Sequence, residues 1–118
     1  MALILIVDDA LLSRSMVKKI LKSQGHITIE AKDGEEALRQ IKEKQPDFVC
    51  LDMLLPKING IEVLQKLYDE KSSIPVVMIT ADTQETTRQK CLELGAISVL
   101  NKPVKAEQLN QLIISAIK

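Results

Sequence analysis

The sequence contains few of the residues that would indicate its function directly. Tryptophan is absent, and one tyrosine and one phenylalanine are the only aromatic residues among 118. The core must therefore be aliphatic, and no set of aromatic side chains is available to stack on nucleic-acid bases. The two cysteines, Cys50 and Cys91, lie within apolar patterns and lack the spacing of a metal or redox motif. We interpret both as buried, reduced thiols of a cytoplasmic protein.

The sequence also has no excess of positive or negative charge. Sixteen basic residues balance sixteen acidic ones, so the formal net charge is zero, and the chain has no general attraction for nucleic acid or an anionic membrane. No apolar run approaches the roughly 20 residues of a transmembrane helix. The first residues do not follow the pattern of a secretory signal. The length is that of one domain, and we expect residues 1–118 to form it.

Short apolar runs alternate with longer amphipathic segments along the whole chain. The runs that we expect to be strands are 3–7, 26–30, 47–51, 75–80 and 96–100. Each is followed by a segment with helical periodicity. Five strands alternating with five helices predict a parallel α/β sheet with right-handed crossovers and helices on both faces. The run 26–30 mixes apolar and polar residues, so we place it at an edge of the sheet.

The helical segments also predict which residues face the core. One face of the first helix would carry Met16, Val17, Ile20 and Leu21, and one face of the last would carry Leu109, Leu112, Ile113 and Ala116. Gly25 and Gly95 follow helical segments and are candidates to end them.

Acidic, hydroxyl and amino side chains stand at the carboxyl ends of the expected strands. Asp8 and Asp9 follow the first run, Asp52 follows the third, Thr80 ends the fourth and Lys102 follows the fifth. Ligands of such sheets bind outside the carboxyl ends of the strands, so these side chains should converge. Two carboxylates about 5 Å apart repel by roughly 3 kcal/mol at an effective dielectric near 20. Three together favour a bound cation, and oxygen ligands suit Mg²⁺.

These motifs resemble those of the response-regulator receiver domains of two-component signalling. The chain carries the acidic pair in ILIVDDA, the segment DMLLPKING, the strand end MITA and the tripeptide NKP, in this order. The resemblance covers the whole chain. It implies a doubly wound, flavodoxin-like (βα)5 fold whose five-stranded parallel sheet has the strand order 2-1-3-4-5, with helices on both faces.

The resemblance further implies how the acidic residues share the chemistry. Asp52 would accept a phosphoryl group and contribute to the metal site. Asp9 would bind Mg²⁺ directly and Asp8 through a water molecule. The backbone carbonyl of Leu54 would complete the protein's share of the metal ligands.

The remaining roles implied by the resemblance concern the phosphoryl group and the partners. Thr80 and Lys102 would contact the phosphoryl oxygens, and the peptide bond between Lys102 and Pro103 would be cis. The donor would be a sensor histidine kinase or a phosphotransfer protein, and the output a contact with a downstream protein target. The domain would be a monomer before phosphorylation, and not an enzyme beyond its own phosphorylation and dephosphorylation.

Two other functions stay open on the sequence alone. A small Mg²⁺-dependent phosphohydrolase would use Asp52 as its nucleophile, but no substrate cap or D-x-D-x-T pattern is present. A scaffold with a vestigial site would not need all of the acidic, hydroxyl and lysine positions, which are intact. We therefore expect a phosphorylation-activated switch.

The chain departs from the pattern of the family at positions that concern switching. Val99 stands where many members carry an aromatic residue that swings inward on activation, so other elements must transmit the signal. Asp82, two residues after Thr80, is a candidate to orient water at the phosphoryl group, which Leu54 cannot do. The helix after Asp82 has few apolar anchors before Cys91, as expected of a movable element. We expect the output surface to comprise this helix, the fifth strand and the fifth helix.

Overall fold

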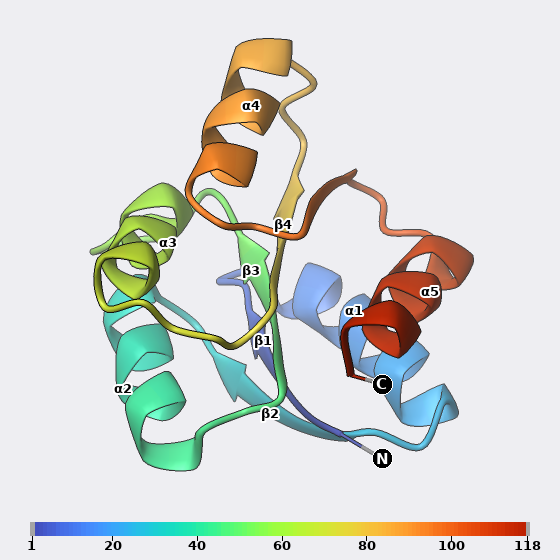
Figure 1. The fold of residues 1–118 in the computed structure, drawn as a ribbon. Coiled ribbons are helices and arrows are strands. Elements are labelled where there is room, and N and C mark those ends of the chain that lie inside the picture. Colours follow the sequence, from blue (N-terminus) through green and yellow to red (C-terminus); the bar gives the residue numbers. More distant parts are fainter. Residues whose placement is uncertain (1, 118) are drawn as a thin grey trace.

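The computed structural model describes residues 2–117 and shows five strands and five helices in strict alternation (Figure 1). The strands are β1 (Leu3–Val7), β2 (Ile27–Ala31), β3 (Phe48–Asp52), β4 (Val76–Thr80) and β5 (Ser98–Asn101). The helices are α1 (Leu11–Ser23), α2 (Gly34–Lys44), α3 (Gly60–Asp69), α4 (Glu85–Glu93) and α5 (Ala106–Ile117). All strands are parallel, in the order β2-β1-β3-β4-β5, which confirms the predicted doubly wound fold.

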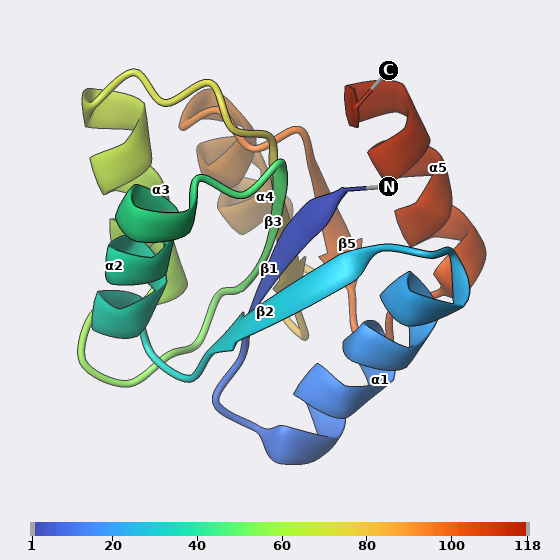
Figure 2. The same cartoon turned by 90° about the horizontal axis from the view of Figure 1, so that it is seen from below.

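Helices cover both faces of the sheet, with α2, α3 and α4 on one face and α1 and α5 on the other (Figures 1 and 2). Successive residues of a strand point to opposite faces. In β1, Leu5 and Val7 therefore join the core under α2 and α3, while Ile4 and Ile6 join the core under α1 and α5. This is why the central strands read as continuous apolar runs. Within residues 2–117, no helix combines the length and apolar character needed to cross a membrane.

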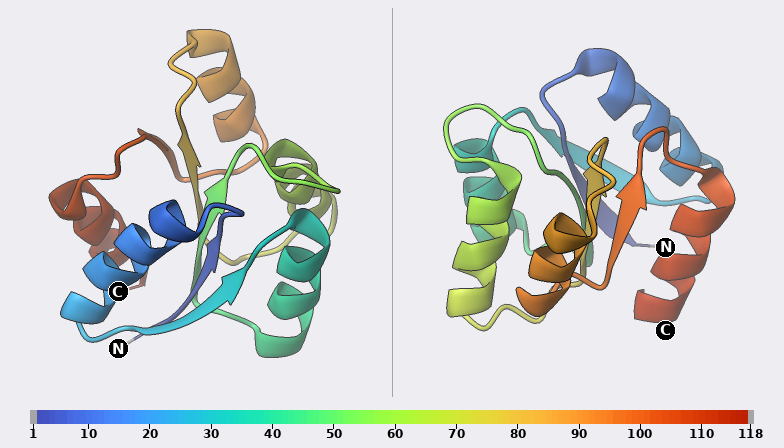
Figure 3. Two further views of the ribbon diagram at one scale, coloured as in Figure 1. Left: turned by 180° about the vertical axis from the view of Figure 1, so that it is seen from behind. Right: turned by 90° about the horizontal axis from the view of Figure 1, so that it is seen from above.

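The two edges of the sheet are β2 and β5. β2 has mostly half-exposed residues and pairs only with β1, which confirms the predicted edge position (Figure 2). At the opposite edge, α4 lies beside β5 (Figure 3). Arg88 of α4 donates a hydrogen bond to the carbonyl of Val99 in β5, at 3.1 Å.

The start of α3 is fixed close to the end of β3. Asn59 and Glu62 form a reciprocal capping box, in which each side chain accepts a hydrogen bond from the other residue's backbone amide. The amide of Gly60 donates to the carbonyl of Met53, at 2.8 Å. A Cβ atom at Gly60 would overlap the backbone of Asp52 and Met53, so the close approach requires glycine.

The core face of α1 differs from the prediction in one residue. Val17 and Leu21 are buried and Ile20 is partly buried, but Met16 is 55% exposed. The side chain of Arg14 is buried instead, 6% exposed. Positions 14, 17 and 21 follow the helical repeat on one face, whereas position 16 is turned about 100° away from position 17. The predicted core residues of α5 are buried or partly buried, as expected.

α4 is the least anchored helix of the fold. Among its residues, all of which the structure describes, only Cys91 is buried, and the side chain of its N-cap residue, Gln84, makes no capping hydrogen bond. Cys50, by contrast, lies in the central strand β3 and is buried. Both cysteines are free thiols, as predicted, and burial raises the pKa of Cys50 to about 12 and that of Cys91 above its ordinary value.

We expect the two thiols to report on different openings of the fold. The native protein at pH 8 should react slowly with a disulfide reagent, and Cys91 should react well before Cys50. Local opening of α4 exposes only Cys91, whereas Cys50 requires the sheet to open. The variants Cys50→Ala and Cys91→Ala assign the two phases of the reaction. Equal rates, or faster labelling of Cys50, would contradict the weak anchoring of α4.

Candidate functional site

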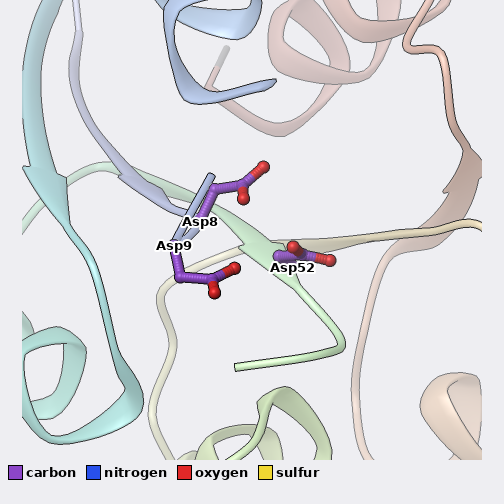
Figure 4. Close-up of side chains that lie close together, drawn as sticks. All are labelled: Asp8, Asp9 and Asp52. Atoms are coloured by element: carbon purple, nitrogen blue, oxygen red, sulfur yellow. The ribbon is translucent and has the colours of Figure 1, made fainter. Parts of the chain in front are cut away.

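Three aspartates meet at the carboxyl ends of β1 and β3. Asp8 and Asp9 follow β1, and Asp52 is the last residue of β3. Because β1 and β3 are paired neighbours in the sheet, the three aspartates lie together although they are far apart in the sequence (Figure 4). One carboxylate oxygen from each residue lies within 4.8 Å of those of the other two. Asp8 and Asp52 are buried, while Asp9 is exposed. The predicted acidic convergence is therefore present.

Lys102 and Thr80 reach the same edge from β5 and β4. The ammonium group of Lys102 lies 3.1 Å from an oxygen of Asp52 and 3.4 Å from one of Asp8. The backbone amide of Lys102 donates to the carbonyl of Thr80, which is the last residue of β4 and buried. The peptide bond between Lys102 and Pro103 is cis, as predicted.

The charges in this pocket oppose one another. Burial raises the pKa of Asp52 above its ordinary value and the charge of Asp8 adds to the rise, although the hydrogen bond from Lys102 works against it. Burial also acts to raise the pKa of Asp8, but hydrogen bonds from Ser13 and the amide of Ala10, together with the charge of Lys102, outweigh it, and the net pKa is lowered. For Lys102, burial acts to lower the pKa, but the bonds to Asp52 and Asp8 outweigh it, and the net pKa is raised. One ammonium does not neutralise three carboxylates, so the pocket is suited to a cation.

The donor set fits Mg²⁺. Three carboxylates within reach of one another supply the hard oxygen ligands that this ion prefers, and the exposure of Asp9 leaves room for bound water. Leu54, two residues after Asp52, has an exposed side chain, 76% accessible. Its side chain takes no part in the cluster, in keeping with a contribution by the backbone alone.

The hydroxyl of Thr80 donates its hydrogen bond to a weak acceptor. It donates to the thioether sulfur of Met53, at 3.7 Å, and accepts a hydrogen bond from the amide of Asp82, at 3.0 Å. The carboxylate of Asp82 accepts from the amide of Gln84 and the hydroxyl of Thr87, so it is engaged at the first turn of α4. These hydrogen bonds give no support to the expectation that Asp82 orients water.

Sequence reasoning found the five charged and hydroxyl residues of the site but missed two of their supports. Arg14 donates to the backbone carbonyl of Asp8, and Met53 accepts from Thr80. An arginine within an amphipathic helix is normally solvated, and nothing in the sequence pattern marks it as buried. Met53 follows Asp52 directly, but its partner is 27 residues away, and only the paired strands bring the two together.

The fold and the pocket define a class: a doubly wound α/β domain with an acidic pocket at the carboxyl edge of its sheet. Comparison with protein families identifies the family within this class: residues 4–114 match the response regulator receiver domain. The chain therefore belongs to the response regulator receiver domains.

Curated relatives carry this domain as part of longer proteins. The chain is 38% identical over 107 residues to the alkaline phosphatase synthesis transcriptional regulatory protein PhoP of Bacillus subtilis, covering 91% of this chain and 45% of PhoP. It is 41% identical over 104 residues to a protein-glutamate methylesterase/protein-glutamine glutaminase of Bacillus licheniformis, covering 85% of this chain and 29% of that protein. The chain thus spans less than half the length of either relative.

Solved structures agree with the fold throughout. The receiver domain of the Francisella response regulator 1452 has a TM-score of 0.94 at 25% identity, covering 99% of this chain and 97% of that one. The Borrelia burgdorferi CheX-CheY-BeF3-Mg+2 complex contains a chain with a TM-score of 0.89 at 33% identity, covering 96% of this chain and 87% of that one.

Proposed function

We propose that residues 1–118 form a phosphorylation switch in which Asp52 accepts a phosphoryl group from a phosphohistidine. The donor is a sensor histidine kinase or a phosphotransfer protein, and the response is a changed contact with a downstream protein. The observation that carries this proposal is the ammonium of Lys102 placed within 3.4 Å of both buried carboxylates, Asp8 and Asp52. A buried nucleophile with a positive charge beside it is what transfer of an anionic group requires.

The chemistry needs few side chains. An oxygen of Asp52 forms the new bond to phosphorus, the bond from phosphorus to the histidine nitrogen breaks, and its electron pair stays on the nitrogen of the leaving imidazole. Asp9, Asp52 and the backbone carbonyl of Leu54 would hold Mg²⁺ directly and Asp8 would hold it through water. When bound, the ion would neutralise charge on the transferred oxygens. Lys102 contributes the second positive charge, because its ammonium already lies 3.1 Å from Asp52.

The signal then passes through Thr80. A thioether is a weak acceptor, so the hydroxyl of Thr80 gives up little when it leaves Met53 for a phosphoryl oxygen. The amide of Asp82 is bound to the same hydroxyl, and the carboxylate of Asp82 holds the first turn of α4. A move of Thr80 is thereby transmitted to α4 without the aromatic residue that Val99 replaces. The surface that responds comprises α4, β5 and α5.

The chain catalyses only its own phosphorylation and dephosphorylation, and it is a monomer until it is phosphorylated. We assign the protein to the cytoplasm, because two free cysteines suit a reducing compartment. The intact pocket gives no reason to prefer a scaffold with a vestigial site. Turnover of a generic phosphate ester would favour a phosphohydrolase instead.

Beryllofluoride, which stands in for the phosphoryl group, tests the proposal. With Mg²⁺ present it should shift the backbone amide resonances of residues 81–101 in the parent protein. The Thr80→Ala variant should show far smaller shifts in this segment, because the hydroxyl that links the pocket to Asp82 is missing. The experiment is supported by the Borrelia neighbour, whose complex contains BeF3 and Mg²⁺.

Val99→Ala is the matched control. It shortens a buried side chain of β5 without touching the hydrogen bonds of Thr80, so the shifts in residues 81–101 should persist. Strong dependence on Val99, or shifts confined to the acidic pocket in the parent, would overturn this route of transmission.

A further inference from the structure

Arg14 is a buried cation directly behind the acidic pocket. It lies in the first turn of α1 and is 6% exposed. Its Nε donates to Glu30 of β2, at 2.7 Å, and its Nη1 donates to the backbone carbonyl of Asp8, at 2.8 Å. One planar guanidinium thus joins α1, the edge strand and the end of β1.

Burying a guanidinium is costly unless its charge is paired and its hydrogen bonds are made. Glu30 supplies the charge and also accepts from Lys18 on the outer side, at 3.0 Å. With its own charge balanced in this way, Arg14 can remain beside a site that takes a divalent cation.

The carbonyl that Arg14 binds has a particular importance. It belongs to the peptide unit between Asp8 and Asp9, which is planar, so fixing this oxygen fixes the direction in which the chain continues to Asp9. The amide of Asp8 donates to Ala31, and a carboxylate oxygen of Asp8 accepts from Ala10. Among residues 2–117, no side-chain hydrogen bond or ion pair involves Asp9, so its placement depends on the backbone.

We propose that Arg14, locked by Glu30, is a positioning residue for the Mg²⁺ site: it clamps the peptide between Asp8 and Asp9 so that both carboxylates face Asp52. This inference rests on the proposed function. Lysine cannot replace arginine in this role, because a single ammonium nitrogen does not span the two acceptors with the geometry of the guanidinium fork.

The test is the Mg²⁺ affinity of folded Arg14→Lys, measured by titration calorimetry at a temperature at which circular dichroism shows the fold intact. Supporting residues around metal ligands typically change affinity 10–100-fold, and we expect a loss of about tenfold here. Lys18→Gln is the matched control, because it removes the other partner of Glu30 and leaves Asp8 untouched. Its affinity should stay within about twofold of the parent's.

A second measurement needs no variant. In the parent, the Nε–H resonance of Arg14 should exchange slowly and shift when Mg²⁺ is added, because the peptide it clamps adjusts to the ion. The Nε–H of Arg39, whose side chain is 58% exposed, serves as the internal reference and should not shift.

The outcomes separate this inference from the proposed function. A parent that binds no Mg²⁺ refutes both. A parent that binds Mg²⁺, with unchanged affinity in Arg14→Lys and a silent Arg14 resonance, overturns the clamp alone. A lowered melting temperature without loss of affinity would make Arg14 a structural residue only.

Discussion

Asp52→Ala should leave the protein unable to take up a phosphoryl group. With acetyl phosphate and Mg²⁺, the intact mass of the parent should rise by one phosphoryl group, and the variant should show no adduct. Alanine offers no oxygen to attack phosphorus. We expect the carboxylates of Asp8 and Asp9 not to replace it, because the proposed function assigns both of them to Mg²⁺. A chelator should abolish the adduct in the parent as well.

The same variant should remain folded, which separates the chemical role from a structural one. Burial raises the pKa of Asp52 in the folded protein, so ionised Asp52 costs stability at neutral pH. That cost disappears as the pH falls below the ordinary carboxyl pKa of 3.8. Removing the group should therefore leave the free energy of unfolding at pH 7 unchanged or higher.

Asp69→Ala is the control and should keep the full adduct, because the side chain of this helical aspartate accepts from Gln65 and takes no part in the acidic pocket. A normal adduct on Asp52→Ala would show that another residue is the acceptor.

Gly60→Ala should damage both the stability and the site. A methyl group at this position would meet the backbone of Asp52 and Met53, which are held by the sheet and cannot yield as a flexible side chain could. Overpacking of this kind costs about 1–3 kcal/mol. Because the strain falls on Asp52, the proposed phosphoacceptor, the rate of adduct formation should fall in protein that is still folded. Urea unfolding and intact-mass kinetics measure the two effects.

Gly25→Ala separates steric overlap from backbone strain. Gly25 has φ of +84°, so alanine is disfavoured there as well, but no atom lies within 4 Å of the position that its methyl group would take. This variant should lose about 1–2 kcal/mol through the left-handed backbone alone and accept the phosphoryl group at the parent rate. If Gly60→Ala behaved in the same way, the contact with Asp52 would not limit the site.

The sequence was sufficient to predict the sheet and the residues that meet at its carboxyl edge. Apolar runs covered on both faces identify central strands, and parallel strands bring their final residues to one edge, so Asp52 and Lys102 could be placed together without a structure. The residues that support the site could not be predicted from the sequence. Burial of Arg14 depends on Glu30, which is 16 positions away on another element, and helical periodicity carries no information about that pairing.

The single buried anchor of α4 also bears on how sharply the domain can switch. A change from 1:99 to 99:1 between two conformations needs about 5.5 kcal/mol of differential stabilisation. One hydrogen bond to a charged group supplies about 1.5–3 kcal/mol. A helix held by one buried side chain, Cys91, by the bond from Arg88 and by the hydrogen bonds to Asp82 costs little free energy to move, and it can therefore also move without a stimulus. We therefore expect a graded response to phosphorylation, with measurable binding of the downstream protein by the unphosphorylated domain. A pathway that uses this domain must respond only to a signal above that basal level.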